Sequence, residues 1–243
     1  MERIQKVIAN YGYCSRRKAE ELIKQKKVSV NGNIVDKLGM LVSNKDEIII
    51  EGNLLTKEKQ FEYYLLNKPR GVVSTTNDEH NRKTVVDLID TKTRIYPIGR
   101  LDYDTTGLIL LTNDGDLANK LMHPSSNIDK TYIAKIKGII TGYDIKRLRD
   151  GVIIDNVKTS KAKVKLKEID KKKETSLVEL TIHEGKNHQV KKMFEALGYK
   201  VDKLTRIKYT IFDIKELKTG EYRKLTKKEI NILYNLVNQA NNK

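Results

Sequence analysis

The sequence predicts an α+β protein built around a largely antiparallel sheet. After residue 61, segments with strand character outnumber helical ones and follow one another in adjacent runs, which favours α+β over an alternating α/β arrangement. The length of 243 residues suits two modest domains. Because the pattern changes near residue 60, we expect a small domain at residues 1–58 and a larger one at residues 61–240.

Two short helices are expected to open the first domain. Apolar residues recur at helical spacing from Ile4 to Ile8, and Gly12 follows as a stop. Ser15 can cap a second helix over residues 15–25, which carries one apolar stripe and an opposite cationic face. We therefore expect this second helix to bury one face and to expose its positive charge.

A hairpin and a further strand are expected to complete the first domain. Residues 27–35 alternate between apolar and polar side chains around Asn31-Gly32, the pair that best tolerates the positive φ angles of a tight turn. Residues 46–52 read as another strand. The charged segment Thr56–Gln60 then reads as a linker.

Longer strands and intervening helices are expected in the second domain. A β-rich run over residues 62–75 is bent by Pro69 and Gly71, and Gly198 can end a helix as a left-handed cap. The expected helices span residues 84–89, 115–122 and 187–197, and a last helix starts near Thr226. The further expected strands span residues 132–138, 162–169, 176–184 and 200–212.

The charge balance predicts a polyanionic partner. Lysine and arginine total 48 against 32 acidic residues, which gives a net charge of +16 and a pI near 9.6. Basic side chains that neutralise phosphates release condensed counterions, so this surplus favours nucleic acid binding at low salt.

Several classes of protein are not expected. The single cysteine, Cys14, cannot form an internal disulfide and reads as a small core residue, and the four histidines have no metal-binding spacing. We therefore expect no metal. No apolar run approaches the roughly 20 residues that cross a bilayer, so we expect a cytoplasmic protein without a membrane partner.

The segment GRLDYDTTGLILLTNDG, residues 99–115, predicts the catalytic site. Arg100 stands two residues before Asp102, and both precede an apolar, strand-like run. A calcium-binding loop does not fit, because Asn113 stands where a bidentate glutamate is needed. Residues 102–106 also match the DxDxT signature of phosphatases that form an aspartyl-phosphate, but that signature follows a hydrophobic strand, whereas here the strand comes afterwards. We expect Asp102 to be the catalytic residue of an enzyme acting on RNA.

The first 50 residues resemble a known RNA-binding module. The string SRRKAEELI followed by VxVNG is similar to the alpha-L motif, the small domain named after a primary ribosomal protein of the small subunit. The resemblance implies that double-stranded or loop RNA is held through its phosphates and recognised mainly by shape. The RNA-binding side chains that it implies are Arg16, Arg17, Lys18 and Lys27.

Residues 99–115 resemble the signature of RNA pseudouridine synthases, GRLDxx(S/T)xGLLLLTNDG, in the branch that carries an N-terminal alpha-L module. Further agreement comes from residues 67–72, from Lys130-Thr131-Tyr132, from EGKNHQVKKMFEALG and from Leu204-Thr205-Arg206 with GEYRKLTKKE behind it. The similarity spans nearly the whole chain. Within the branch it is greatest to synthases of large-subunit ribosomal RNA.

This resemblance implies a role for each matching residue. Asp102 corresponds to the catalytic aspartate, Tyr132 to the tyrosine that packs on the uracil ring and assists proton transfer, and Lys191 to the cation that pairs with the aspartate. Leu204 corresponds to the apolar floor of the pocket, and Arg100 to the arginine that enters the RNA helix where the target uridine leaves it. The remaining substrate-binding candidates are His188, Gln189 and Arg206.

The resulting hypothesis is a monomeric enzyme that converts one uridine of ribosomal RNA, expected to be 23S, to pseudouridine without a cofactor. A buried aspartate would tend to take up a proton, so we expect Lys191 to keep Asp102 charged in a dry cavity. The alternative is a catalytically silent RNA-binding or ribosome-assembly factor. Two departures from the family pattern are Lys191, where other branches carry arginine, and Lys208-Tyr209-Thr210-Ile211, where many relatives place glycine and proline.

Overall fold

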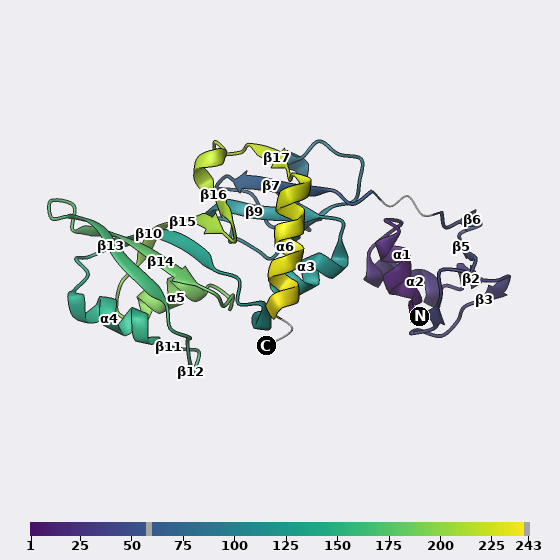
Figure 1. Cartoon of the computed structure of the whole chain (residues 1–243), viewed down its shortest axis with the longest axis horizontal. Helices are drawn as coiled ribbons and strands as arrows, with labels where there is room; N and C mark the ends of the chain where they lie inside the picture. Colours follow the sequence, from purple (N-terminus) through teal and green to yellow (C-terminus); the bar gives the residue numbers. More distant parts are fainter. Residues whose placement is uncertain (57–59, 241–243) are drawn as a thin grey trace. The chain divides into compact units, whose positions relative to one another are not determined.

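The computed structural model describes residues 1–56 and 60–240 and divides into two compact units (Figure 1). The first unit comprises residues 1–62 together with two short segments, 91–94 and 113–115, and the second comprises the remainder. Residues 57–59, within the segment expected to be a linker, lie outside the described residues.

The first unit contains two helices against small sheets. Ser15 caps the second helix by accepting a hydrogen bond from the Lys18 amide at 3.1 Å. The Asn31-Gly32 turn has φ angles of 50° and 81°, and it joins the first two strands of the hairpin as the sequence predicted. The helices are α1 (Ile4–Asn10) and α2 (Arg16–Lys24); the strands are β1 (Glu2–Arg3) with β4 (Leu41–Val42), and the sheet β3-β2-β5-β6, with β2 (Val28–Val30), β3 (Asn33–Ile34), β5 (Ile48–Ile50) and β6 (Asn53–Leu54).

The core of this unit is made from one face of each helix and from alternate strand residues. Ala19, Leu22 and Ile23 of α2 are buried, as their helical spacing predicted, whereas Cys14 is only partly buried at the edge of the core. The amphipathic helices leave their charged faces in solvent.

A nine-stranded sheet forms the centre of the second unit. Its order is β13-β14-β10-β15-β9-β7-β17, with β16 beside β15 and β8 beside β9. All pairings are antiparallel except that of β15 with β9, so the predicted α+β class with a largely antiparallel sheet is confirmed. The strands are β7 (Tyr63–Lys68), β8 (Tyr96–Ile98), β9 (Thr106–Thr112), β10 (Lys130–Lys137), β13 (Lys163–Asp170), β14 (Thr175–Ile182), β15 (Val201–Tyr209), β16 (Phe212–Asp213) and β17 (Tyr222–Lys224), with a separate hairpin of β11 (Ile153–Ile154) and β12 (Val157–Lys158).

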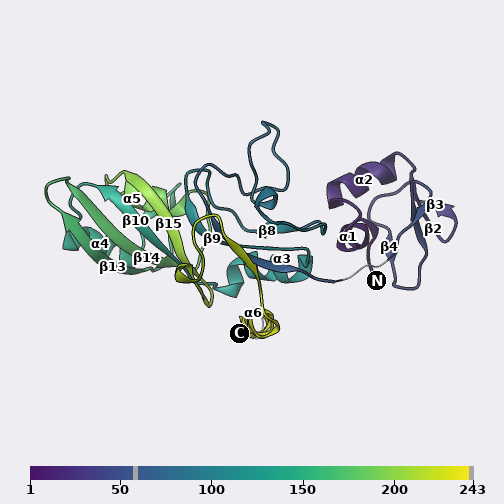
Figure 2. The same ribbon diagram turned by 90° about the horizontal axis from the view of Figure 1, so that it is seen from above.

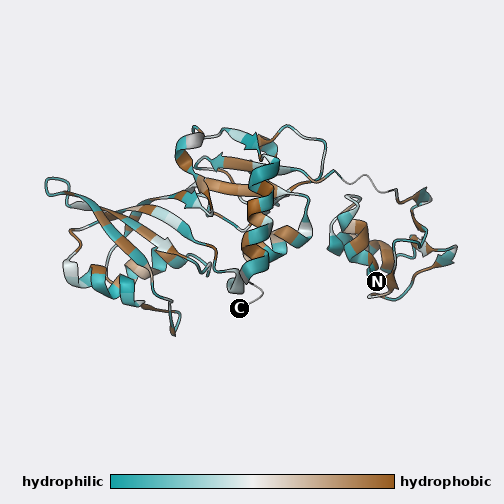
Figure 3. Ribbon diagram, in the orientation of Figure 1, coloured by the Kyte–Doolittle hydropathy of each residue, from teal (hydrophilic) through white to brown (hydrophobic). Residues whose placement is uncertain are grey.

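Helices cover both faces of this sheet. Alternation along β7 sends Tyr63 and Leu65 to the face covered by α3 and α6, and Tyr64 and Leu66 to the opposite face (Figures 1 and 2). Strand β9 is apolar along most of its length because both of its faces are buried (Figure 3). The helices are α3 (Gly115–Met122), α4 (Gly142–Asp150), α5 (Gln189–Glu195) and α6 (Lys227–Ala240), and the 3₁₀ turns are η1 (Val86–Leu88), η2 (Pro124–Ser126) and η3 (Ile214–Glu216).

Strands β9 and β15 join the two halves of the sheet and approach each other closely at one point. The parallel pairing of β15 with β9 comprises Thr205 with Thr106 and Arg206 with Gly107. A Cβ atom at Gly107, whose φ is +111°, would lie 2.2 Å from the backbone oxygen of Arg206. Glycine is therefore required here by both conformation and space.

Three expectations about the second unit were wrong or incomplete. Residues 84–89 form only the single turn η1: hydrogen bonds between Thr84 and Asp87 cap its start, but the chain is already extended at Ile89, with φ −115° and ψ 119°. The strand expected over residues 200–212 is broken by a two-residue turn in which Thr210 has a φ of 54°. Helix α4 was missed, although Thr141 caps it and the Thr-x-x-Asp pattern marks its start.

Candidate active site

A cavity of about 880 Å³ lies in the second unit, within the size range of small-molecule sites. One wall is the loop from Gly99 to Thr105 that connects β8 to β9, and another is the loop from His183 to His188 that precedes α5. The floor comes from β10 and β15. The loops supply the polar and charged groups of the walls, and the strands supply a rigid floor.

Asp102 is held in its wall by contacts to its backbone. The Nζ atom of Lys68, at the end of β7, donates to the carbonyl oxygens of Pro69, Asp102 and Thr105 at 3.1, 3.0 and 2.8 Å. Lys68 is fully buried, and desolvation lowers its pKa to about 8. The ammonium group therefore cross-links a loop that has no strand partner of its own.

Two further contacts fix the same loop. The Ser74 hydroxyl accepts from the amide of Leu101 at 3.1 Å and donates to the carbonyl of Leu101 at 2.8 Å. The Gly71 amide donates to the Tyr103 carbonyl at 2.9 Å. The residues on both sides of Asp102 are thus anchored, which leaves its side chain oriented by a defined backbone.

Lys191 of α5 faces the carboxylates of this loop. Its Nζ atom lies 3.0 Å from Asp102 Oδ2 and 2.6 Å from Asp104 Oδ1. Burial acts to lower the pKa of Lys191, but hydrogen bonds to Asp104 and Asp102 outweigh it and raise that pKa. The hydrogen bond from Lys191 likewise lowers the pKa of Asp104.

The environment of Asp102 differs from the dry cavity that the sequence suggested. Its side chain is 29% exposed, because the cavity is open where the loop forms its rim. His188 lies on the same rim, with Nε2 3.5 Å from Asp102 Oδ1. The carboxylate is therefore reachable by a large substrate, and a bound substrate rather than the free protein would have to exclude water.

The start of α5 is shaped by Gln189. This side chain is buried; its Oε1 accepts from the Lys186 amide at 2.9 Å and its Nε2 donates to Glu184 at 3.0 Å. His188, which precedes the helix, has a φ of 53°. Both the oxygen and the nitrogen of the Gln189 amide are thus hydrogen-bonded within the loop, whereas the His188 side chain is half exposed.

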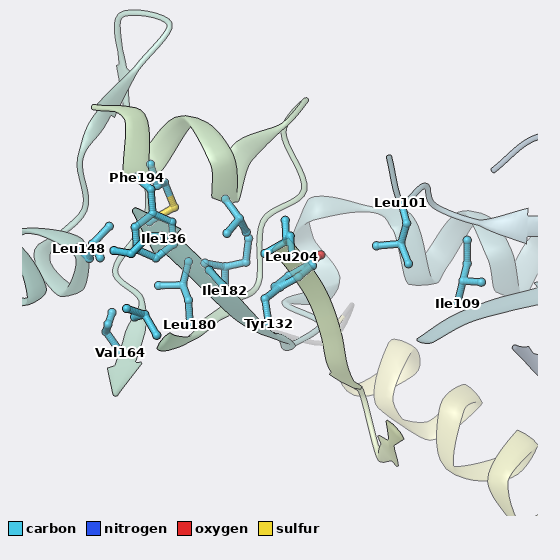
Figure 4. Close-up of a cluster of buried hydrophobic side chains, with 14 of the residues drawn as sticks. Leu101, Ile109, Tyr132, Ile136, Leu148, Val164, Leu180, Ile182, Phe194 and Leu204 are labelled. Atoms are coloured by element: carbon cyan, nitrogen blue, oxygen red, sulfur yellow. The ribbon is translucent and has the colours of Figure 1, made fainter. Parts of the chain in front are cut away.

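Tyr132 and Leu204 form the floor of the cavity. They lie on the paired strands β10 and β15, where Ala134 is opposite Leu204 and Tyr132 is opposite Arg206. Figure 4 shows the Tyr132 ring next to Leu204, with Leu101 and Ile109 in the same apolar cluster. An aromatic ring and a branched aliphatic group side by side provide a flat apolar surface for a base.

Two cations lie beside this floor, Arg206 buried and Lys130 half-buried. Arg206 is 3% exposed; its Nε donates to the Leu108 carbonyl at 2.6 Å, its guanidinium lies 4.7 Å from the Tyr209 ring, and its Nη2 meets no hydrogen-bond partner among the described residues. Lys130 donates to the carbonyls of Ile128, His183 and Glu184, and burial lowers its pKa to about 8. An unpaired buried donor next to a cavity is costly without a ligand.

The remaining residues singled out from the sequence lie outside this cluster. Arg100 is exposed on the cavity rim. The four cations of the alpha-L resemblance belong to the first unit, where Lys18 pairs with Glu21 at 3.1 Å and Lys27 with Glu51 at 2.9 Å. Sequence reasoning assigned no role to Lys68, Ser74, Asp104 or Lys130; Lys68, Asp104 and Lys130 lie within matched motifs, whereas Ser74 does not.

Two observations on side-chain and helix geometry concern the part of the chain that the structure describes. Across residues 1–56 and 60–240, no three His, Cys, Asp or Glu side chains come together to hold a metal ion. Over the same residues, no helix is both long enough and apolar enough to span a bilayer.

Comparisons with known proteins agree with the two-unit division. Residues 62–196 match the family model of RNA pseudouridylate synthase, and residues 2–48 match that of the S4 domain. The chain is 52% identical over 243 residues to ribosomal large subunit pseudouridine synthase B of Bacillus subtilis, covering 100% of this chain and 99% of that one. It is 35% identical to an uncharacterized RNA pseudouridine synthase of Aquifex aeolicus, covering 97% and 94% of the two chains.

Solved structures give the same result. A crystal structure of a pseudouridylate synthase matches with a TM-score of 0.68 and 36% identity, over 96% of this chain and 100% of that chain. A protein chain of an H/ACA ribonucleoprotein bound to substrate RNA matches at a TM-score of 0.51 and only 16% identity, and this shows a shared fold alone.

Proposed function

The chain belongs to the RNA pseudouridine synthase family of isomerases, and from that premise we propose that it converts one uridine of large-subunit ribosomal RNA to pseudouridine, with Asp102 as the catalytic residue. The observation that carries the assignment of Asp102 is its ion pair with Lys191, 3.0 Å long, on the wall of a cavity of about 880 Å³.

Three findings support ribosomal RNA as the substrate. The relative from Bacillus subtilis is named for the large ribosomal subunit, residues 2–48 match an S4 domain, and the net charge is +16. We assign RNA capture to a domain of residues 1–58, mainly through phosphates, and catalysis to a domain of residues 61–240. The expected target is 23S RNA.

The reaction explains why so few groups suffice. The C1′–N1 bond of uridine breaks and a C1′–C5 bond forms within the same nucleotide, while C5 loses a proton and N1 gains one, so the composition is unchanged and no net oxidation or reduction occurs. The base must leave the RNA stack, detach, rotate and rejoin the sugar. The Asp102 carboxylate can either attack C1′ to form a transient ester or remove the 2′ proton to give a glycal, and both routes end in the same product.

Each neighbouring side chain has a role that its position suits. Lys191 holds the Asp102 carboxylate in place through its ion pair, and Asp104 shares the charge of Lys191. The Tyr132 ring and Leu204 support the uracil from below, and the unpaired Nη2 of Arg206 can donate to a substrate oxygen. Arg100 and His188 stand on the rim, where the RNA strand enters.

An Asp102→Asn variant tests the proposal against Asp104→Asn, a matched control because both carboxylates contact Lys191. Large-subunit RNA from a deletion strain should lack one pseudouridine; wild-type protein and Asp104→Asn should restore it, and Asp102→Asn should not, although it binds the RNA with unchanged affinity. Restoration by Asp102→Asn would overturn the assignment of Asp102. A deletion strain with a complete set of pseudouridines would favour the RNA-binding factor.

A further inference from the structure

A second hollow of about 410 Å³ adjoins the catalytic cavity. The two share Asp102, Arg100, Ser74 and His188, so they are continuous at the proposed catalytic residue. Beyond that junction the second hollow is lined by Tyr103, Arg82 and other residues of the loop from Asn77 to Arg82. We infer that it is a nucleobase subsite, in which the base next to the target uridine stacks on Tyr103 and Arg82. This inference rests on the proposed function.

Tyr103 is an apolar surface presented beside the reacting group. It directly follows Asp102, and it is 50% exposed, which is unusual for a large ring on an otherwise anchored loop. Its backbone carbonyl accepts from the Gly71 amide at 2.9 Å, so the ring projects from a fixed point. Unstacked RNA bases are commonly held on such aromatic side chains and on arginine planes.

Arg82 extends the stacking surface. Its guanidinium carbon lies 5.8 Å from the centre of the Tyr103 ring. Two of its nitrogens donate to Asp78, with Nε 3.1 Å from Oδ2 and Nη2 2.7 Å from Oδ1. Because a carboxylate already neutralises Arg82 through two parallel hydrogen bonds, the arginine is suited to stack on a base rather than to bind a phosphate.

The loop that carries Arg82 is built to hold it in place. The Asp78 side chain is only 8% exposed and also accepts from the amides of His80 and Arg82 at 3.1 and 3.0 Å. Hydrogen bonds from Arg82 hold the pKa of Asp78 well below its ordinary value. At the base of the loop, the Val73 amide donates to Lys83 and the Val85 amide donates to Val73, both at 3.0 Å.

Chain connectivity links the two hollows. When the uridine occupies the larger cavity with its sugar at Asp102, the adjoining nucleotide must leave across the rim that Asp102 shares with the smaller hollow. Contacts to flanking nucleotides are a general source of sequence-context preference in enzymes that flip bases. Tyr103 and Arg82 would thus supply specificity rather than chemistry.

The test combines two variants with two altered substrates. Conversion of an RNA fragment containing the mapped uridine is measured for wild type, Tyr103→Ala and Tyr103→Phe, on intact RNA and on RNAs that lack the base immediately 5′ or immediately 3′ to that uridine. We expect Tyr103→Ala to raise KM about 10-fold with kcat within about twofold, in line with the measured strength of base–aromatic stacking. Tyr103→Phe, which keeps the ring, should match wild type.

The decisive result is the coupling between ring and base. One of the two base-lacking RNAs should raise the KM of wild type about 10-fold and leave that of Tyr103→Ala nearly unchanged, since the stacking partner is already gone. If the increases in KM caused by Tyr103→Ala and by the missing base simply multiplied, the subsite would be overturned. A fall in kcat alone for Tyr103→Ala would also overturn it, because that result would indicate a role in holding the Asp102 loop. Wild-type protein that converts no uridine of the fragment would instead overturn the proposed function.

Discussion

The close approach at Gly107 gives a quantitative prediction for the Gly107→Ala variant. Gly107 has a φ of +111°, and an added Cβ would lie 2.2 Å from the Arg206 carbonyl oxygen, 2.7 Å from its nitrogen and 2.8 Å from its carbonyl carbon. All three atoms belong to the backbone of β15, so no side-chain rotation can relieve the overlap. The two strands would have to separate by about 1.3 Å to restore an ordinary contact distance of roughly 3.5 Å.

The expected loss of stability has two sources. A non-glycine residue in this part of φ/ψ space costs about 1–3 kcal/mol, and forcing a methyl group into a well-packed site costs about 1–3 kcal/mol more. We therefore expect Gly107→Ala to lower the free energy of unfolding by about 3 kcal/mol or more, a large part of the roughly 5–15 kcal/mol that is typical of a folded domain. Because β9 follows the Asp102 loop and β15 carries Leu204, activity should fall as well.

Chemical denaturation of matched variants can separate the two sources. Gly198→Ala has a similar positive φ of +83° with nothing within 4 Å of the added Cβ, so it reports the conformational cost alone. Gly142→Ala, at the start of α4 and also without a close neighbour, should be near neutral. If Gly107→Ala unfolds within about 1 kcal/mol of Gly198→Ala, the steric argument for the β9–β15 contact is wrong.

Three further predictions concern the site and the RNA-binding face. Lys191→Met should lower the single-turnover rate of pseudouridine formation about 30-fold while Lys191→Arg retains most of it, because a charge contact at 3 to 4 Å is worth about 1–4 kcal/mol at a partly exposed site; an unaffected Lys191→Met would contradict this. For Lys68, burial lowers the pKa to about 8, so the unfolded chain holds a proton that the folded chain has released between about pH 8 and 10.5. The free energy of unfolding of wild type should therefore rise across that window relative to Lys68→Met, by at most about 3 kcal/mol, and parallel pH profiles would refute the shift. Alanine at both Arg16 and Arg17 should weaken RNA binding and reduce the slope of log K against log salt by roughly 0.7–0.9 for each phosphate that the protein no longer neutralises, whereas an unchanged slope would place the RNA elsewhere.

Local patterns predicted the features that depend on local chemistry. The positive φ angles at Asn31 and Gly32 and the Ser15 cap follow from the residues themselves, and the fold class follows from the order of strands and helices. The pairing of Asp102 with Lys191 was expected from a family resemblance, since 89 residues separate them in the chain and no local pattern relates them.

Other features could not be read from the sequence, for distinct physical reasons. Lysines are normally exposed, so nothing in the residue type indicates that Lys68 is buried and Lys130 half-buried, each with its ammonium group against backbone carbonyls. The segment 84–89 has a helical pattern and a Thr84–Asp87 cap at its start, but the chain becomes extended at Ile89 after one turn, and no local pattern marks that end. The openness of the site around Asp102 depends on how distant loops meet, which composition does not encode.

Lys68 and Lys130 explain how a site built on loops can be rigid. Loop carbonyls have no strand partner and must find donors elsewhere. Lys68, at the end of β7, reaches two carbonyls of the wall that carries Asp102 as well as that of Pro69. Lys130, at the start of β10, reaches the carbonyls of His183 and Glu184 in the other wall as well as that of Ile128. Each long side chain thus transfers the rigidity of a strand to the loop beside it. The ends of the strands then fix the positions of the reactive groups. The exposed side chains of the loops are left to contact the RNA.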